Sequence, residues 1–211
     1  MDRNKPTPAV AAALMLAFDH FNADLFDAKL PAPMFVWQRN KRSRGHFHGD
    51  VWKDRAANSC ADEISLNPDL MEERSEKEIL STLVHEMCHQ RQHHFGKPSR
   101  NGYHNKEWAG MMREVGLEPS STAAPGGKDT GQKVSHYIVK GGRFCASCEM
   151  LTGAGWRFPW SSVDTRQPPK PSKSSKVKFT CPECEANAWG APSLRIVCSD
   201  CDERMKSAAD L

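Results

Sequence analysis

The spacing of apolar residues near the start of the chain predicts a long helix. Apolar side chains recur every three or four residues, the period of one helix face, at Val10, Leu14, Phe18, Phe21 and Leu25. Thr7 followed by Pro8 matches an N-cap and a first-turn proline. Prolines at positions 31 and 33 forbid continuation of the helix. We therefore expect a helix over about residues 8–27.

Three short segments rich in aromatic and β-branched residues follow this helix. They span residues 34–37, 45–52 and 63–66, and turn-forming residues separate them. Asn67-Pro68 closes the last segment. This pattern predicts a small antiparallel sheet.

The strongest helix signal in the chain begins at Ser75. The sequence Ser75-Glu76-Lys77-Glu78 matches a capping box, and the apolar pattern continues until Gly96 supplies a stop. One side of this helix carries the apolar residues Ile79, Leu80, Leu83, Val84 and Met87. The opposite side carries the polar residues Thr82, His85, Glu86, His89, Gln92 and His93. We expect the apolar side to pack in a core and the polar side to line a cleft.

The pattern beyond this helix is weaker. A further short helix is expected from about His104 to Val115, with Trp108 on its buried side. Residues 120–133 have the composition of a flexible linker or mobile loop, and residues 167–178 are rich in Pro, Ser and Lys. Helices combined with a small sheet indicate an α+β fold.

Size and cysteine spacing limit the class of protein. A chain of 211 residues with 38% hydrophobic residues can form one core and a small additional module. Its formal net charge of +3 is too small to indicate a partner by itself. Six of the eight cysteines form three Cys-x-x-Cys pairs, at 145/148, 181/184 and 198/201. This spacing is typical of zinc sites in a reducing compartment, so we expect a cytoplasmic protein.

The start of the chain could be mistaken for an export signal. Arg3 and Lys5 precede an apolar run over residues 9–18. We reject this interpretation because the helical spacing continues past Asp19 and Asp24. No stretch is long enough to span a bilayer, so we expect no membrane partner.

Residues 85–89 contain the motif that indicates a catalytic activity. The sequence His85-Glu86-Met87-Cys88-His89 is an HExxH pattern, in which two histidines one helical turn apart bind Zn²⁺ and the glutamate acts as a general base. A catalytic zinc needs a third protein ligand and one open position. Among His93, His94, His104 and a carboxylate further along the chain, we favour His104, because a loop with two glycines allows it to approach from the start of the next helix. The pattern predicts metal-assisted hydrolysis.

Several of these residues carry a resemblance to a known family. The HExxH motif, a glycine seven residues after it, the segment His104-Asn105-Lys106-Glu107-Trp108 and the Ile64-Ser65-Leu66-Asn67 strand resemble the SprT-like zinc metalloproteases. The resemblance covers about residues 8–120, with Asn105 where the family usually has glycine. It implies a minimal zincin-type peptidase related to Spartan, which degrades proteins trapped on DNA. Many members of this family also have a C-terminal zinc ribbon.

The last two cysteine pairs predict that ribbon independently. Cys181, Cys184, Cys198 and Cys201 form two knuckles separated by a hairpin-length segment, as a closed structural zinc site requires. We therefore expect one catalytic and one structural Zn²⁺. For Cys145 and Cys148 we favour a short helix in which Cys148 joins a core, with a second metal or a redox pair as the alternative.

Basic residues dominate the segment between residues 126 and 180. Its candidate nucleic-acid-binding residues are Lys170, Lys173, Lys176 and Lys178, and Trp156, Phe158 and Trp160 add stacking surface nearby. An ordinary solvated linker beside a small core is the alternative. His46 and His48 share one face of a strand; we favour an exposed sheet face over a substrate groove.

Together these observations predict three parts: a SprT-like zincin catalytic domain over residues 1–120, a basic, partly ordered linker over 121–178, and a zinc ribbon over 179–211. We expect a zinc metalloendopeptidase acting on protein substrates, with DNA, either single-stranded or in a DNA–protein complex, as a possible partner. The alternatives are a non-catalytic zinc-ribbon adaptor that binds nucleic acid or is associated with transcription, and a nuclease or other hydrolase that uses the same zinc.

Overall fold

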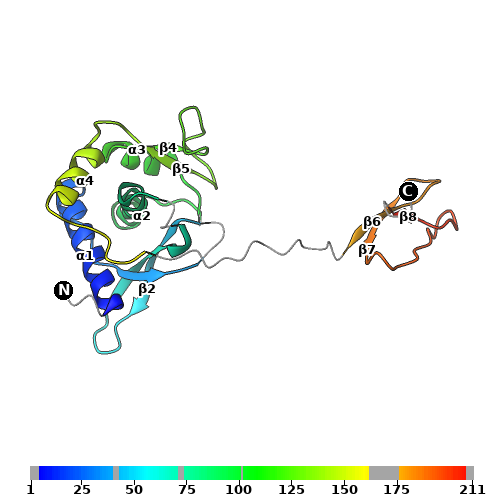
Figure 1. Ribbon diagram of the computed structural model, residues 1–211, viewed down its shortest axis with the longest axis horizontal. Helices are drawn as coiled ribbons and strands as arrows, with labels where there is room; N and C mark the ends of the chain where they lie inside the picture. Colours follow the sequence, from blue (N-terminus) through cyan, green and yellow to red (C-terminus); the bar gives the residue numbers. More distant parts are fainter. Residues whose placement is uncertain (1–4, 40–42, 71–73, 101, 162–175, 208–211) are drawn as a thin grey trace. The chain divides into compact units, whose positions relative to one another are not determined.

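Two units with separate cores make up the protein. The computed structural model describes residues 5–39, 43–70, 74–100, 102–161 and 176–207 (Figure 1). The first unit is Met1–Asp164 and the second is Thr165–Leu211.

Helix α1 (Pro6–Leu25) presents the predicted apolar face, with Val10, Leu14, Phe18 and Phe21 buried. It begins earlier than predicted: Lys5 is the N-cap and makes no capping bond, so the assignment of Thr7 as the cap is wrong. Pro6, whose φ is already helical, starts the helix instead. Among the described residues, no helix is both long and apolar enough to cross a membrane.

The three predicted strands form a mixed sheet rather than an antiparallel one. They are β1 (Met34–Trp37), β2 (Gly45–Lys53) and β3 (Cys60–Leu66), in the order β1-β3-β2. β3 pairs parallel with β1 and antiparallel with β2. Because β3 lies between two strands that run in opposite directions, it must be parallel to one of them. A 3-10 turn (η1, Pro68–Leu70) follows the sheet, and β2 is left as an edge strand.

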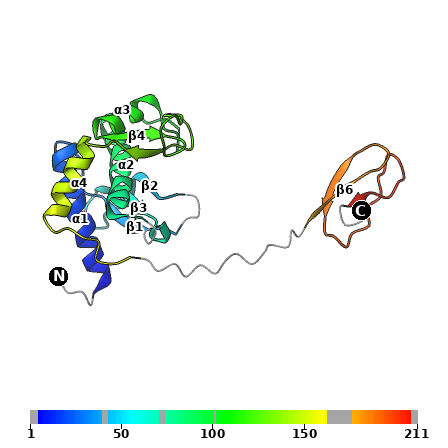
Figure 2. The ribbon, with the colours of Figure 1, turned by 45° about the horizontal axis from the view of Figure 1, so that its top comes forward.

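Helix α2 (Glu76–Phe95) passes through the middle of the first unit (Figure 2). The predicted capping box is confirmed: the Ser75 side chain accepts from the backbone N–H of Glu78, and the Glu78 carboxylate accepts from the Ser75 N–H at 2.8 Å. The helix ends before Gly96, as predicted. It contacts β2, β3, α1, α3 and α4, so it is buried on several sides.

Helix α3 (Lys106–Glu114) is followed by the hairpin β4 (Leu117–Ser120) and β5 (Ser135–Ile138). The loop between these strands was expected to be a linker or mobile loop. It is instead held to the first unit, because Gly131 forms a β-bridge with His104 and the Arg113 guanidinium of α3 donates to Asp129 Oδ2 at 2.8 Å.

Helix α4 (Arg143–Gly153) lies beside α1 (Figures 1 and 2). Phe144, Cys148 and Leu151 on this helix, and Trp156 after it, are buried in the main core. The first unit therefore extends well beyond the boundary expected at residue 120. The aromatic residue Trp156, read as possible stacking surface, closes the core instead, and its indole N–H donates to the Ala13 carbonyl at 2.9 Å.

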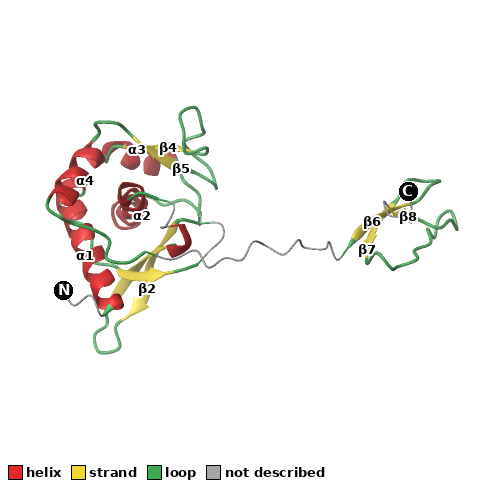
Figure 3. Cartoon of the chain, viewed as in Figure 1, coloured by secondary structure: helices red, strands yellow, loops and turns green. Residues whose placement is uncertain are grey.

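The second unit contains strands and loops but no helix over residues 176–207 (Figure 3). Its strands are β6 (Val177–Thr180), β7 (Asn187–Gly190) and β8 (Lys206–Ser207), in the antiparallel order β7-β6-β8. The core consists of only Phe179, Met205 and the cysteines Cys181 and Cys198, with partly buried neighbours. Apolar burial on this scale is rarely enough for a stable fold, so a metal is expected to contribute.

The position of Trp156 in the core can be tested by truncation. We expect Trp156→Ala to lower the free energy of unfolding of the first unit by about 3–5 kcal/mol, because it removes a large buried side chain and leaves a cavity. Trp160, which is 46% exposed, provides the matched control. Urea unfolding measures both, and equal small effects of the two substitutions would contradict the assignment.

Candidate metal centre

Three histidines from two segments converge in the first unit. His85 and His89 lie one turn apart on α2, and His104 lies two residues before α3. One ligand atom from each lies within 4.8 Å of the others. The predicted trio therefore does come together. The other candidates turn elsewhere: His93 Nε2 contacts Asp50 Oδ2 at 2.8 Å and His94 Nε2 contacts Asp62 Oδ2 at 2.7 Å.

His104 is held by the loop that the sequence did not assign to this domain. Its N–H donates to the Gly131 carbonyl at 2.9 Å, and the Gly131 N–H donates back to the His104 carbonyl at 3.0 Å. The ring Nδ1 of His104 also contacts the Gly131 carbonyl, at 3.2 Å. An Nδ1–H that donates there leaves Nε2 to bind a metal.

His85 is held by a residue that sequence reasoning missed. His85 Nδ1 lies 3.0 Å from Nδ1 of the buried His136 on β5, and His136 Nε2 lies 2.9 Å from the Ser81 hydroxyl. The Ser81 hydroxyl donates to the Glu78 carbonyl at 2.8 Å. If His85 binds a metal through Nε2, its Nδ1–H donates to His136, and His136 Nε2–H donates to Ser81. Every hydrogen in this chain then has an acceptor.

No spacing signal points to His136. It lies 51 residues from His85 and belongs to a four-residue strand. The alternation in Ser135-His136-Tyr137-Ile138 could have indicated a strand, but not its partner across the domain. The strand that carries His136 pairs with β4 and with no other described strand, so its position near His85 depends on tertiary packing.

Trp108 forms one wall of the histidine cluster. It is fully buried, and its ring centroid lies 4.9 Å from that of His85, 5.0 Å from that of His89 and 4.3 Å from that of His104. The rings of His89 and Trp108 are stacked, 18° from parallel. The three imidazoles are therefore packed against one rigid surface, which restricts their rotation.

Burial keeps these imidazoles neutral. It lowers the pKa of His89 to about 3, with a further decrease from the nearby His104, and it lowers the pKa of His85 well below its ordinary value. Burial also lowers the pKa of His104, and it lowers the pKa of His136 to about 3. Neutral imidazole is the form that binds a metal, so the cluster is prepared for coordination near pH 7.

Glu86 is buried next to the histidines, and burial raises its pKa to about 8. Within the described part of the chain, no hydrogen bond or ion pair reaches its carboxylate. Gly45 on β2 lies directly over it: a Cβ at this position would be 2.9 Å from Glu86 Oε1 and 2.8 Å from the Ser65 carbonyl. Glycine at position 45 thus lets the edge strand approach this carboxylate closely.

A cavity of about 910 Å³ opens beside these groups, lined by the three histidines, Glu86 and residues of β2. His46 and His48 belong to this lining, although their favoured assignment was an exposed sheet face. His48 is half exposed and His46 is 21% exposed by side chain. A cavity beside an edge strand, lined by both polar and apolar groups, is suited to an extended ligand.

The sequence of this region matches one family. The model of the SprT-like family covers residues 14–126, which is more than half of the chain. The chain belongs to the SprT-like family. No curated protein and no solved structure matches it. The SprT-like segment contains His85, Glu86, His89 and His104, and this family suggests a metalloprotease-like domain. The matched segment ends before His136.

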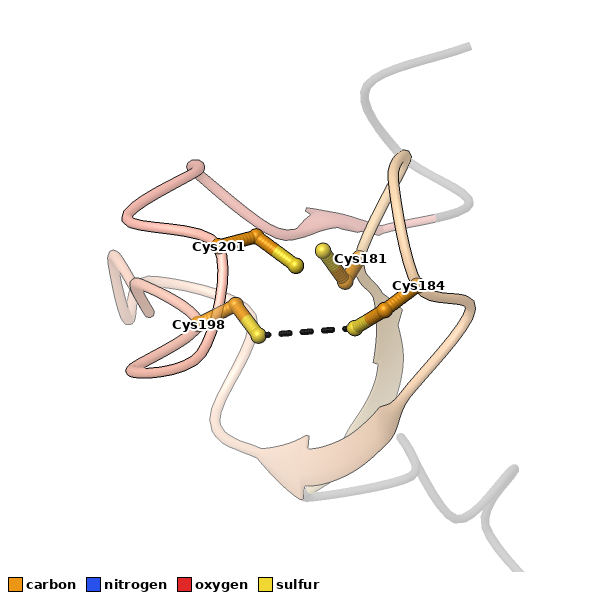
Figure 4. A group of neighbouring side chains, drawn as sticks. All are labelled: Cys181, Cys184, Cys198 and Cys201. Atoms are coloured by element: carbon orange, nitrogen blue, oxygen red, sulfur yellow. Dashed lines mark hydrogen bonds between the residues drawn. The ribbon is translucent and has the colours of Figure 1, made fainter.

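The second unit of this SprT-like protein brings its four cysteines together (Figure 4). Its two knuckles repeat the same backbone bonds: the Cys181 N–H donates to the Ala186 carbonyl at 2.9 Å, and the Cys198 N–H donates to the Glu203 carbonyl at 2.8 Å. The residue after each pair, Glu185 or Asp202, has a positive φ, of 58° or 55°. The two halves of one ribbon-type site are therefore formed by the same local turn.

The donor atoms of both sites fit zinc. Cys184 Sγ and Cys198 Sγ are 3.6 Å apart, and a tetrahedral site with Zn–S bonds of about 2.3 Å separates its sulfur atoms by about 3.8 Å. Four thiolates close a site, as structural zinc requires. Three neutral imidazoles beside a cavity leave room for a further ligand, as catalytic zinc requires.

The remaining candidates are the third cysteine pair and the four lysines. Cys145 and Cys148 are buried on α4, and burial raises the pKa of the Cys148 thiol, so the favoured helix assignment is confirmed. Lys170 and Lys173 lie outside the described residues. Lys176 and Lys178 are exposed on the second unit.

The role of His136 in holding His85 can be tested through metal affinity. We expect His136→Ala to weaken zinc binding at the three-histidine site by about 10–100-fold, because partners of metal-binding histidines orient the ring and raise its basicity. Chelator competition measures this in a background carrying Cys181→Ser and Cys198→Ser. His93→Ala, which removes a histidine from the same cavity, is the control, and an equal loss in both would contradict the assignment.

Proposed function

We propose that the first unit is a zinc-dependent endopeptidase in which Glu86 is the general base. The observation that carries this proposal is a buried carboxylate with no partner in the described structure, one residue from His85 and beside a cavity. Burying such a group is costly unless a cation or a reacting proton uses it. A metal that only stabilised the fold would leave Glu86 without a role, which argues against the non-catalytic adaptor.

The residues of the chain supply the proton transfers. Bound zinc would lower the pKa of a water molecule and polarise the scissile carbonyl. Glu86 accepts the proton of the attacking water and then delivers it to the leaving amine. Without a cation, the raised pKa of about 8 leaves most of Glu86 protonated at neutral pH. A nearby dication favours the carboxylate, so loading the site with metal also prepares the base.

The edge strand β2 offers a way to hold a peptide. One side of β2 pairs with β3, and the other side borders the cavity with Arg44 to His48. An extended peptide can add to such an edge through backbone hydrogen bonds. This arrangement recognises peptide backbone rather than one side chain, which suits an endopeptidase.

We further propose that the second unit confines cleavage to proteins on DNA. Lys178 on β6 lies directly opposite Trp189 on β7, and Trp189 is 63% exposed. A cation beside an exposed aromatic ring is the combination that binds single strands through phosphate contacts and base stacking. The resemblance to Spartan-related SprT-like proteases is a further reason for this proposal.

The catalytic role of Glu86 gives a direct prediction. We expect Glu86→Gln to lower peptide cleavage by about 10²–10⁴-fold and to leave zinc content unchanged, because the amide cannot accept the proton and is not a ligand. The assay follows cleavage of a DNA-binding protein and of the enzyme itself, with and without single-stranded DNA. Glu114→Gln, an exposed glutamate paired with Arg91, is the control. Equal activity of wild type and Glu86→Gln would reject the proposal.

The DNA contact gives a separate prediction. We expect Trp189→Ala to weaken binding of a single-stranded oligonucleotide by about 1–3 kcal/mol, the range for loss of one stacked base. Fluorescence anisotropy at fixed salt measures the change. Trp37→Ala removes an exposed tryptophan of β1 in the first unit and should have no such effect. Unchanged binding by Trp189→Ala would place the DNA contact elsewhere or exclude it.

A further inference from the structure

A second cluster of metal-binding side chains lies on the sheet. His46 and His48 on β2 and Glu63 on β3 each place one ligand atom within 4.8 Å of the others. His46 and His48 also line the cavity, but none of the three is a ligand or a proton-transfer group in the proposed peptidase chemistry. Two imidazoles and a carboxylate are a ligand set that proteins use for transition metals and that leaves coordination positions open.

The strand register brings these groups to one face. His48 is paired directly with Glu63, and His46 lies two residues away along the same strand. Residues two apart on a strand point to the same side, while Phe47 between them packs against the core. The ring centroids of the two histidines are 4.6 Å apart. The pairing of β2 with β3 therefore places these three side chains together.

The distances suit a single cation. Glu63 Oε1 lies 3.1 Å from His46 Nε2 and 3.8 Å from His48 Nδ1. Ligand bonds of about 2.0–2.2 Å around zinc place neighbouring donor atoms about 3.4 Å apart in a tetrahedron. These two distances bracket this value, and the two imidazole nitrogens lie within 4.8 Å of each other, so the three groups are within reach of one ion.

The carboxylate is oriented for this role. The indole N–H of Trp52 donates to Glu63 Oε2 at 2.9 Å, which leaves Oε1 facing the two imidazoles. Ligating carboxylates are commonly held by such a bond on their other oxygen. The Glu63 side chain is 15% exposed and that of His48 is 50% exposed, so an ion can enter from the His48 side.

The neighbouring group formed by Asp62, His93 and His94 lacks this arrangement, although its ligand atoms are also close together. Asp62 Oδ2 accepts from Gln90 at 2.7 Å and contacts His94 at 2.7 Å, and Asp62 Oδ1 accepts from the Asp50 N–H at 3.0 Å. Both oxygens of Asp62 are therefore already used by the fold. His93 contacts Asp50 instead.

We propose that His46, His48 and Glu63 form a further zinc site that cross-links the edge strand β2 to β3. Its occupation ties down the strand that borders the cavity. The site is distinct from the three-histidine and four-cysteine sites, and it exists whether or not the first unit is a peptidase.

Zinc content of the full chain tests this proposal by difference. Protein is dialysed against buffers of increasing free zinc, and zinc per chain is measured by mass spectrometry. At saturation, the double variant His46→Ala/His48→Ala should bind one zinc fewer than wild type, whatever the occupancy of the other sites. Glu63→Gln, which keeps the shape of the side chain, should bind this ion at least about tenfold more weakly, because it removes the charged ligand.

Two matched controls exclude other ligands. His93→Ala/His94→Ala removes the histidines of the neighbouring group, and Cys145→Ser/Cys148→Ser removes the third cysteine pair; both should keep the wild-type zinc count. Equal counts in wild type and the His46/His48 variant would overturn the proposal. A loss of one zinc per chain in either control variant would also overturn it.

Discussion

The burial of α2 is the constraint on which the first unit depends. This helix contacts the sheet and three other helices, so its polar side chains lose water and need partners within the protein. Residues distant in sequence supply them: Ser81 bonds with His136, Gln90 with Asp62, and Gln92 with Asn105. These bonds fix the sheet, the start of α3 and β5 around one helix. The metal-binding histidines are thereby positioned by the same contacts that form the core.

Glu86 on the same helix has no such partner among the described residues, and its position explains the site. Its carboxylate has no partner in the described structure, and burial raises its pKa to about 8. The imidazoles beside it are neutral because the same burial lowers their pKa values. The three imidazoles supply no positive charge, so a dication balances the carboxylate and satisfies the three ring nitrogens at once.

Local signals in the sequence predicted the parts of the fold that depend on neighbouring residues. The capping box at Ser75, the turn spacing of His85 and His89, and both cysteine knuckles are short-range patterns, and the structure has them. His104 was found because a zinc site requires a third donor. The parallel pairing of β1 with β3 and the contact of His136 with His85 depend on tertiary packing, which no spacing encodes. The extent of the first unit was missed because Trp156 looked like a surface aromatic in a basic segment, although it fills the core beside α1.

The arrangement of the three histidines around one ion is the central claim, and anomalous diffraction at the zinc edge tests it most directly. Crystals of the zinc-loaded protein should show one ion within bonding distance, about 2.0–2.1 Å, of ring nitrogens of His85, His89 and His104, with the remaining position facing the cavity. An ion with His104 turned away, or with a fourth side chain of the protein in that position, would contradict the account.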